Sequence, residues 1–373
     1  MKIDHCDHCG QVVFFENSLC VNCGHTLAFF PDRMQIGSLE SDDAGALRRP
    51  EAIGVKNHYR LCANYSAHQV CNWAVDVDDP NPLCESCRLT KVIPSLTQSG
   101  AREAWYKLET AKRRLVYTLM ALKLPITPKT DDPEKGLAFE FLADPDPAEK
   151  DAKPVLTGHA NGLITINIAE ADDAERERRR VSMGEPYRTL LGHMRHEVGH
   201  YYWEVLIKDA PRLEAYRHLF GDERADYGEA LQKHYAAGPP ADWNARFISA
   251  YAAAHPWEDW AESWAHYLHM TDTLETAADC GLQLKPGRSD EPKMKATALP
   301  VGKQPDSFQV MVNNWFPLTY VLNNLNRGMG LPDGYPFVMS PAVIDKLRFI
   351  HETIAAQART GLRTASKKPI AAA

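Results

Sequence analysis

The cysteines of this chain are concentrated near its beginning. The 373-residue sequence contains nine, and eight of them precede residue 90. Two Cys-x-x-Cys pairs come first, separated by ten residues, and each is followed by a glycine, Gly10 or Gly24, where a tight turn often requires a positive φ. Each turn brings two thiolates within reach of one zinc ion, and two turns complete a tetrahedron. The pattern predicts a small β-rich module built around zinc. Its expected ligands are Cys6, Cys9, Cys20 and Cys23.

The other early cysteines form a looser set. Its first two members are separated by eight residues, an unusual spacing, whereas its last two form another Cys-x-x-Cys pair. His58 or His68 could replace one cysteine. Four thiolates close a zinc site and leave no position for a substrate, so we expect structural zinc in a zinc-ribbon region that spans residues 1–95. The expected ligands of the second site are Cys62, Cys71, Cys84 and Cys87.

A second motif, HEVGH at residues 196–200, lies in a segment with a broad apolar face of helical periodicity. Pro186 suits the first position of this helix. Residues four apart share one helix face, so His196 and His200 can direct both imidazoles at one metal ion. Glu197 lies one step round the helix, close enough to reach a water molecule on that metal. In this H-E-x-x-H arrangement of zinc metallopeptidases, the two histidines hold zinc and the glutamate is the general base.

A catalytic zinc ion needs three protein ligands and one open position, so a third ligand must come from elsewhere. One candidate is Asp222, 22 residues past His200. The stronger candidate is the run EDWAE, which follows Pro256 at an expected helix start. Glu258 and Glu262 lie four residues apart on one face of that helix. One carboxylate can bind zinc, and the other can accept the second N–H of a ligand histidine.

The two motifs together resemble those of the gluzincin metallopeptidases and are most similar in pattern to the anthrax-lethal-factor-like group. This resemblance implies that Glu258 binds zinc and that Glu262 lies just outside and orients a ligand. It also implies that Tyr251, seven residues before the ligand glutamate, assists the oxyanion. Over nearly its whole length the chain resembles a family of bacterial zinc-binding metallopeptidases with an N-terminal zinc ribbon. The interval between the two ligand segments is long here, so Asp222 remains an alternative third ligand.

We predict an α+β chain in which a mainly helical, gluzincin-like metallopeptidase domain follows the β-rich zinc-ribbon module. The domain is expected to span residues 96–361, and residues 362–373 to form a disordered tail. Helical periodicity appears at residues 101–124 and 308–326, and strand-like alternation at residues 138–142 and 162–168.

Composition and charge limit the cellular compartment and the binding partners that we expect for this protein. No stretch of 18 or more apolar residues exists, so we expect no membrane span. No apolar run follows the first residues, so we expect no secretory signal. We therefore expect a cytoplasmic protein with reduced thiols. The net charge is −7, and residues 1–95 carry 8 Lys and Arg against 12 Asp and Glu. Zinc sites with four thiolates add further negative charge, which opposes phosphate binding. We therefore expect no nucleic acid, and expect the ribbon to dock on the catalytic domain or on a protein partner.

The leading functional hypothesis is a zinc metallopeptidase with one catalytic and two structural zinc ions, which acts on a peptide or protein. Glu197 would be the general base, and zinc and Tyr251 would stabilise the oxyanion. The main alternative is a catalytically lapsed zinc-ribbon adaptor or regulator that binds a protein partner. A third is a different zinc hydrolase that acts on an amide or a modified peptide. The complete set of His196, His200, Glu197 and Glu258 favours the enzyme, because a lapsed site would be expected to have lost at least one group.

Overall fold

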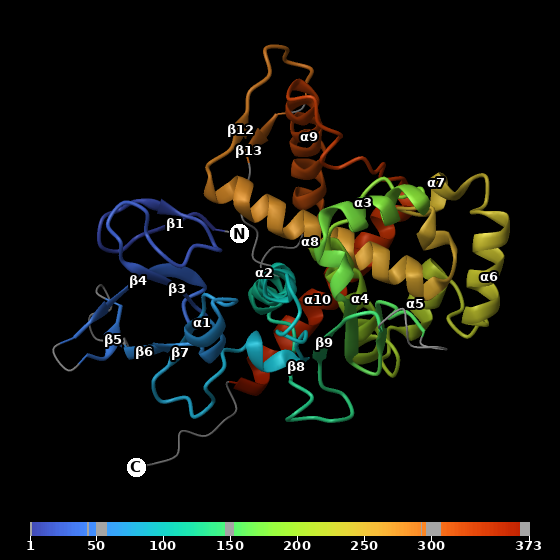
Figure 1. Ribbon diagram of the computed structural model, residues 1–373. Helices are drawn as coiled ribbons and strands as arrows, with labels where there is room; N and C mark the ends of the chain where they lie inside the picture. Colours follow the sequence, from blue (N-terminus) through green and yellow to red (C-terminus); the bar gives the residue numbers. More distant parts are fainter. Residues whose placement is uncertain are drawn as a thin grey trace. The chain divides into compact units, whose positions relative to one another are not determined.

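Figure 1 shows the computed structural model, which describes residues 2–42, 45–49, 58–145, 153–291, 293–295 and 307–365. The chain forms two compact units. The first comprises Met1–Tyr117, Thr127–Gly158 and Gly162–Arg179, and the second comprises Thr118–Ile126, His159–Asn161 and Arg180–Ala373. The first unit thus contains the cysteine-rich region and the beginning of the first long helix. The domain boundary at residue 95 stays a prediction.

The cysteine-rich region is built from short antiparallel strands, as the sequence predicted. A two-stranded ribbon precedes a five-stranded sheet with the order β3-β4-β5-β6-β7. Apolar side chains on one face of this sheet, including Phe30, Leu39 and Tyr59, pack into a small core. The strands are β1 (Asp4–His5), β2 (Val12–Val13), β3 (Thr26–Phe30), β4 (Gln35–Ser41), β5 (Leu47–Arg48), β6 (His58–Leu61) and β7 (Ala74–Asp76).

A parallel arrangement of strands follows within the same unit. The strand β9 (Ala138–Leu142) lies between β8 (Thr90–Val92) and β11 (Leu163–Asn167), and both pairings are parallel. Phe139 and Phe141 on β9 are fully buried, which fits the strand predicted there. The remaining elements of this part of the chain are α1 (Ala63–His68), η1 (Cys87–Leu89), α2 (Ala101–Ala121), β10 (Gly158–Ala160), η2 (Ile168–Ala171) and α3 (Asp173–Ser182).

The second unit is mainly helical, and the predicted α+β class is confirmed. Besides the part of β10 that belongs to it, its strands within the described residues are β12 (Gln283–Leu284) and β13 (Met294–Lys295), which form a short hairpin. No described helix is both long enough and apolar enough to cross a bilayer. The helices are α4 (Leu190–Leu206), α5 (Leu213–Phe220), α6 (Tyr227–Ala237), α7 (Trp243–Arg246), η3 (Tyr251–Ala253), α8 (Pro256–Asp279), α9 (Ser307–Gly328) and α10 (Pro341–Ala365).

Two helix ends differ from the sequence-based expectations. The helix α4 begins after Thr189, whose hydroxyl accepts a hydrogen bond from the Gly192 N–H, and not at Pro186. At the other end of the chain, α10 continues to Ala365, so the first four residues of the expected tail are helical. Residues 366–373 lie outside the described residues. Pro256, in contrast, opens α8 as predicted.

The helices α4 and α8 pack closely at a glycine. The Trp260 indole N–H donates a hydrogen bond of 2.8 Å to the Gly199 carbonyl. A Cβ atom on Gly199 would lie 3.0 Å from Cα of Ala261 and 3.2 Å from Cβ of Trp264, closer than ordinary packing allows. This glycine therefore permits the close approach of the two helices that carry the HEVGH and EDWAE motifs.

Candidate metal centres and active site

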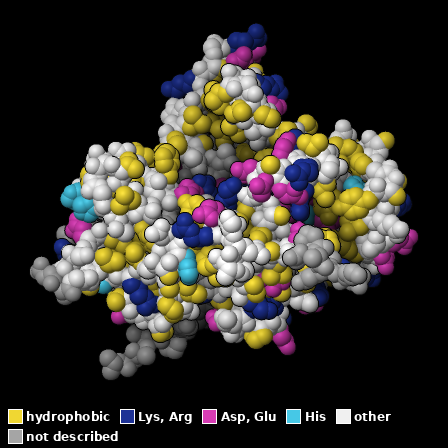
Figure 2. Space-filling view, viewed as in Figure 1, with side chains coloured by type: hydrophobic (Ala, Val, Ile, Leu, Met, Phe, Trp, Pro, Cys, Tyr) yellow, Lys and Arg dark blue, Asp and Glu magenta, His cyan; other side chains and the backbone are white. Residues whose placement is uncertain are grey.

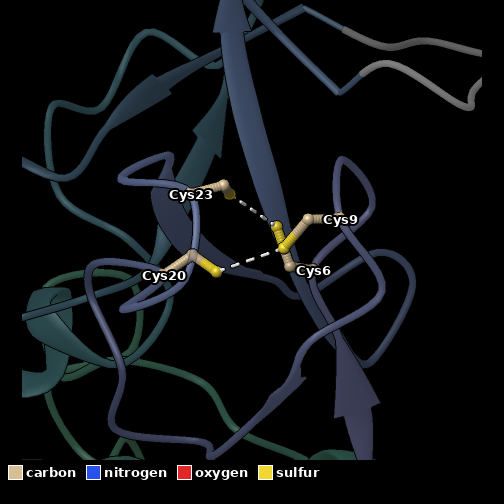
Figure 3. Close-up of side chains that lie close together, drawn as sticks. All are labelled: Cys6, Cys9, Cys20 and Cys23. Carbon is tan, nitrogen blue, oxygen red and sulfur yellow. Dashed lines mark hydrogen bonds between the residues drawn. The ribbon is translucent and has the colours of Figure 1, made fainter.

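The first cysteine set converges in the first unit (Figure 3). The Sγ atoms of Cys6 and Cys23 lie 3.6 Å apart, as do those of Cys9 and Cys20. Tetrahedral zinc with Zn–S bonds of about 2.3 Å would hold its sulfur ligands about 3.8 Å apart, so the set fits zinc. Gly10 and Gly24 have φ angles of 72° and 74°, as predicted for the turns that follow each pair. None of these cysteines forms a disulfide.

The second cysteine set is more deeply buried, and the fold explains its unusual spacing. The helix α1 and its left-handed C-cap residue Gln69 occupy the interval between Cys62 and Cys71. The Sγ atoms of Cys71 and Cys84 lie 3.7 Å apart, and all four thiols are buried. Burial raises the pKa of Cys71 and Cys84, and a bound cation would stabilise their thiolate forms.

Neither histidine proposed as a substitute belongs to this second set. The His58 ring lies 3.3 Å from a carboxylate oxygen of Asp42, and the His68 ring lies against Trp105, with ring centroids 5.3 Å apart. The structure thus brings four cysteines together at each of the two predicted sites.

The second unit brings His196, His200 and Glu258 together, with one ligand atom of each within 4.8 Å of the others. The two Nε2 atoms lie 3.2 Å apart, and Oε2 of Glu258 lies 3.0 Å from Nε2 of His196. Two ligands of one tetrahedral zinc would lie about 3.4 Å apart. Apart from this approach to His196, Oε2 of Glu258 is buried and has no hydrogen-bond partner among the described residues. A cation would satisfy this oxygen, so the donor set fits zinc.

The alternative ligand, Asp222, is not part of this cluster. Its side chain is half exposed and forms an ion pair of 2.7 Å with Arg224. Hydrogen bonds from the side chain and the backbone N–H of Arg224 hold the pKa of Asp222 well below its usual range. Of the two candidates for a third ligand, the fold places only Glu258 beside both histidines.

Glu262 lies where the sequence predicted a carboxylate that orients a histidine. Its Oε1 lies 2.7 Å from Nδ1 of His196, and its Oε2 accepts a hydrogen bond of 2.7 Å from the Ser249 hydroxyl. Burial alone would raise the pKa of Glu262, but the contact with His196 outweighs it and the net shift is downward. An ionised Glu262 fixes the proton on Nδ1 and leaves Nε2 free for a metal ion.

Glu197 contacts a histidine one helical turn before the motif. Nε2 of His193 lies 3.2 Å from Oε1 of Glu197. Burial raises the pKa of this carboxyl group, but the hydrogen bond with His193 and the nearby imidazoles outweigh it, so the pKa is lowered. Sequence analysis did not single out His193 for this contact. Its i,i+4 spacing from Glu197 was the available signal.

Two tyrosines lie beside the candidate ligands His196 and Glu258. The Tyr251 ring lies 6.0 Å from the His196 ring, and burial raises the pKa of Tyr251, so its hydroxyl stays protonated. The Tyr227 hydroxyl donates a hydrogen bond of 2.7 Å to Oε1 of Glu258. Sequence reasoning assigned Tyr227 no role at the site, because 31 residues separate the pair and only the fold brings them together.

Replacement of Tyr227 by phenylalanine removes the hydrogen bond that orients Glu258. We expect zinc affinity at this site to fall by about 10–100-fold, the usual cost of losing a partner of a metal ligand. Competition with a chelator measures the affinity. Tyr320→Phe, on an exposed part of α9, is the matched control and should leave it unchanged. Equal affinities for the two variants would show that Tyr227 does not support the ligand.

The clusters thus comprise two candidate four-cysteine metal sites and a candidate site of two histidines and one carboxylate. Residues 101–353 match a family described as "Putative zinc-binding metallo-peptidase", and residues 3–98 match a zinc-ribbon domain. The chain belongs to this metallopeptidase family, and the predicted resemblance to zinc-binding metallopeptidases with an N-terminal zinc ribbon is confirmed.

The chain is also similar to two mycobacterial proteins, each described as uncharacterized. These are Rv2568c of Mycobacterium tuberculosis (strain H37Rv) and Mb2598c of Mycobacterium bovis. Each is 44% identical over 355 residues, which cover 95% of this chain and 95% of the relative. No solved structure matches the chain significantly.

Proposed function

We propose that this protein is a zinc-dependent peptidase of the gluzincin type, with Glu197 as its general base. The proposal depends on one observation: His196, His200 and Glu258 each offer a ligand atom within 4.8 Å of the others. Glu197 lies on α4, the helix that carries both histidines. Two imidazoles and one carboxylate leave one coordination position of a tetrahedral ion open, as a catalytic zinc site requires. Family membership supports peptide hydrolysis as the reaction.

Each surrounding residue has a defined task in this proposal. Bound zinc supplies a Lewis acid that activates water and polarises a peptide carbonyl group. Glu197, held ionised by His193, accepts a proton from the attacking water and passes it to the departing amine. Tyr251, which stays protonated, donates a hydrogen bond to the developing oxyanion. Glu262 holds His196 in the required tautomer, and Tyr227 orients Glu258.

The proposal includes three zinc ions in each chain, one at the candidate catalytic site and one at each four-cysteine site. The two cysteine sites are closed and would be structural. Their eight thiolates favour a reducing compartment, so we place the protein in the cytoplasm. Its substrate is a peptide or protein, and the zinc ribbon is available to a protein partner. Nothing in the proposal requires nucleic acid or a membrane.

A peptide-library digest tests the proposal. We expect the full-length protein to generate new peptide termini that mass spectrometry detects. Removal of the catalytic metal with a chelator should abolish cleavage, because His196, His200 and Glu258 then hold no Lewis acid. Addition of zinc should restore it.

The same digest separates the alternatives. Zinc-loaded protein that generates no new termini would contradict the peptidase and favour the adaptor. Cleavage that survives complete removal of zinc would contradict zinc dependence.

A further inference from the structure

A further group of metal-binding side chains lies in the zinc-ribbon region, apart from the cysteine sites. It consists of His8, His25 and Glu40, which each offer one ligand atom within 4.8 Å of the others. We propose that these three residues form a solvent-accessible site for a divalent transition metal ion, such as zinc. These residues are not needed as ligands of the neighbouring cysteine site, because four thiolates already close it.

The distances between the ligand atoms suit a shared metal ion better than direct hydrogen bonds. Nδ1 of His8 lies 3.5 Å and Nε2 of His25 lies 3.8 Å from the same oxygen, Oε1 of Glu40. Normal N–H···O hydrogen bonds span about 2.7–3.2 Å. Two ligands of one zinc ion would lie about 3.4 Å apart, within a few tenths of an ångström of the observed separations. The two imidazole rings stack with centroids 3.9 Å apart, so they would tilt apart to direct both nitrogens at one ion.

The fold holds the loop of His8 against the strand of Glu40. Asp7, the residue before His8, accepts a hydrogen bond of 2.8 Å from the Ser38 backbone N–H on β4. Both Asp7 carboxylate oxygens also accept hydrogen bonds from Arg49. A Cβ atom on Gly37 would lie 2.8 Å from Nε of Arg49, so the glycine leaves room for this arrangement. Contacts made by residues outside the cluster therefore hold the loop of His8 close to Glu40.

The position of His25 is fixed in the same way. Its carbonyl oxygen accepts a hydrogen bond of 2.9 Å from the Cys20 N–H in the second zinc knuckle. The next residue, Thr26, is paired with Leu39 across β3 and β4, which places His25 beside Glu40. The knuckles and one strand pairing thus bring all three ligands together before any ion binds.

Exposure and charge both favour an additional cation. The side chains of His8, His25 and Glu40 are 48%, 25% and 29% exposed, so water or a ligand from another molecule can complete the coordination. Histidine and acidic side chains lie side by side on the surface in Figure 2, over the part where Figure 1 labels β1 and β4. His8 lies between two cysteines of the first zinc site, whose four thiolates leave a net negative charge on a zinc centre. Two imidazoles and a carboxylate are ligands that zinc, nickel and copper ions accept.

Equilibrium dialysis against increasing concentrations of Zn²⁺, with elemental analysis of the full-length protein, tests this proposal. We expect the wild type to bind one zinc ion more than the His8→Gln/His25→Gln variant in the micromolar range of free zinc. Glu40→Gln should weaken this binding, because it removes the shared charged oxygen. The matched control, His5→Gln/His58→Gln, changes two exposed histidines outside the cluster and should bind as the wild type does.

The experiment also distinguishes this site from the proposed catalytic centre. The additional ion should still bind when His196→Ala and His200→Ala remove the candidate catalytic ligands. Zinc content at low free zinc, compared between variants, shows whether the cysteine sites remain filled. Wild-type protein that binds no additional ion, or a His8→Gln/His25→Gln variant that binds it equally well, would overturn the proposal.

Discussion

Replacement of Glu197 by glutamine is expected to lower kcat/KM for peptide cleavage by about 10²–10⁴-fold, with no loss of zinc. Glutamine keeps the shape of the side chain but cannot accept a proton. Glu197 itself is held ionised, because the contact with His193 outweighs the effect of burial on its pKa. The ligands His196, His200 and Glu258 are untouched by this change, so zinc binding should persist.

Cleavage rates and zinc content, measured on the same preparations, test this expectation. The matched control is Glu229→Gln, which neutralises an exposed carboxylate on α6 of the same unit and should cleave as the wild type does. A Glu197→Gln variant with wild-type activity would exclude this residue as the base. A variant that loses both zinc and activity would assign Glu197 a structural role instead.

The largest effect on stability is expected from Cys84→Ala. Cys84 is fully buried, its Sγ lies 3.7 Å from that of Cys71, and its N–H donates to Sγ of Cys62. Structural zinc contributes about 10–16 kcal/mol in zinc-finger peptides, which is comparable with the entire stability of a domain, about 5–15 kcal/mol. We therefore expect this variant to lose one zinc ion and the fold of the surrounding sheet.

Elemental analysis and limited proteolysis of the full-length protein would detect both losses. Cys280→Ala is the matched control, because this cysteine is exposed and belongs to neither set. It should keep the zinc content and protease resistance of the wild type. Cys84→Ala protein that behaved like this control would show that the second set holds no structural metal.

The sequence predicted the features that depend on short-range spacing. Cys-x-x-Cys pairs bring thiolates together through a local turn, and HEVGH brings two imidazoles together through one helical turn. The β-rich N-terminal region, the mainly helical remainder and the start of α8 at Pro256 are also confirmed. These features too depend on local sequence patterns. The unusual spacing between Cys62 and Cys71 could be explained only from the structure, in which the helix α1 occupies the interval between them.

Contacts between distant segments could not be predicted. Tyr227, at the start of α6, meets Glu258, and Ser249, just before η3, meets Glu262 on α8 only through the tertiary fold. The choice between Asp222 and Glu258 also depended on tertiary structure, since both are carboxylates that follow the HEVGH motif in the sequence. Likewise, His8 and Glu40 are 32 positions apart and meet through the contact between Asp7 and Ser38.

The most direct test of the account is the number of zinc ions in each chain after dialysis against metal-free buffer. It compares the wild type with the His196→Ala/His200→Ala variant. We predict three zinc ions in the wild type, one for each four-cysteine site and one for His196, His200 and Glu258, and two in the variant. Equal zinc content in the two proteins would contradict the proposed catalytic centre, because only the ribbon would then hold metal tightly.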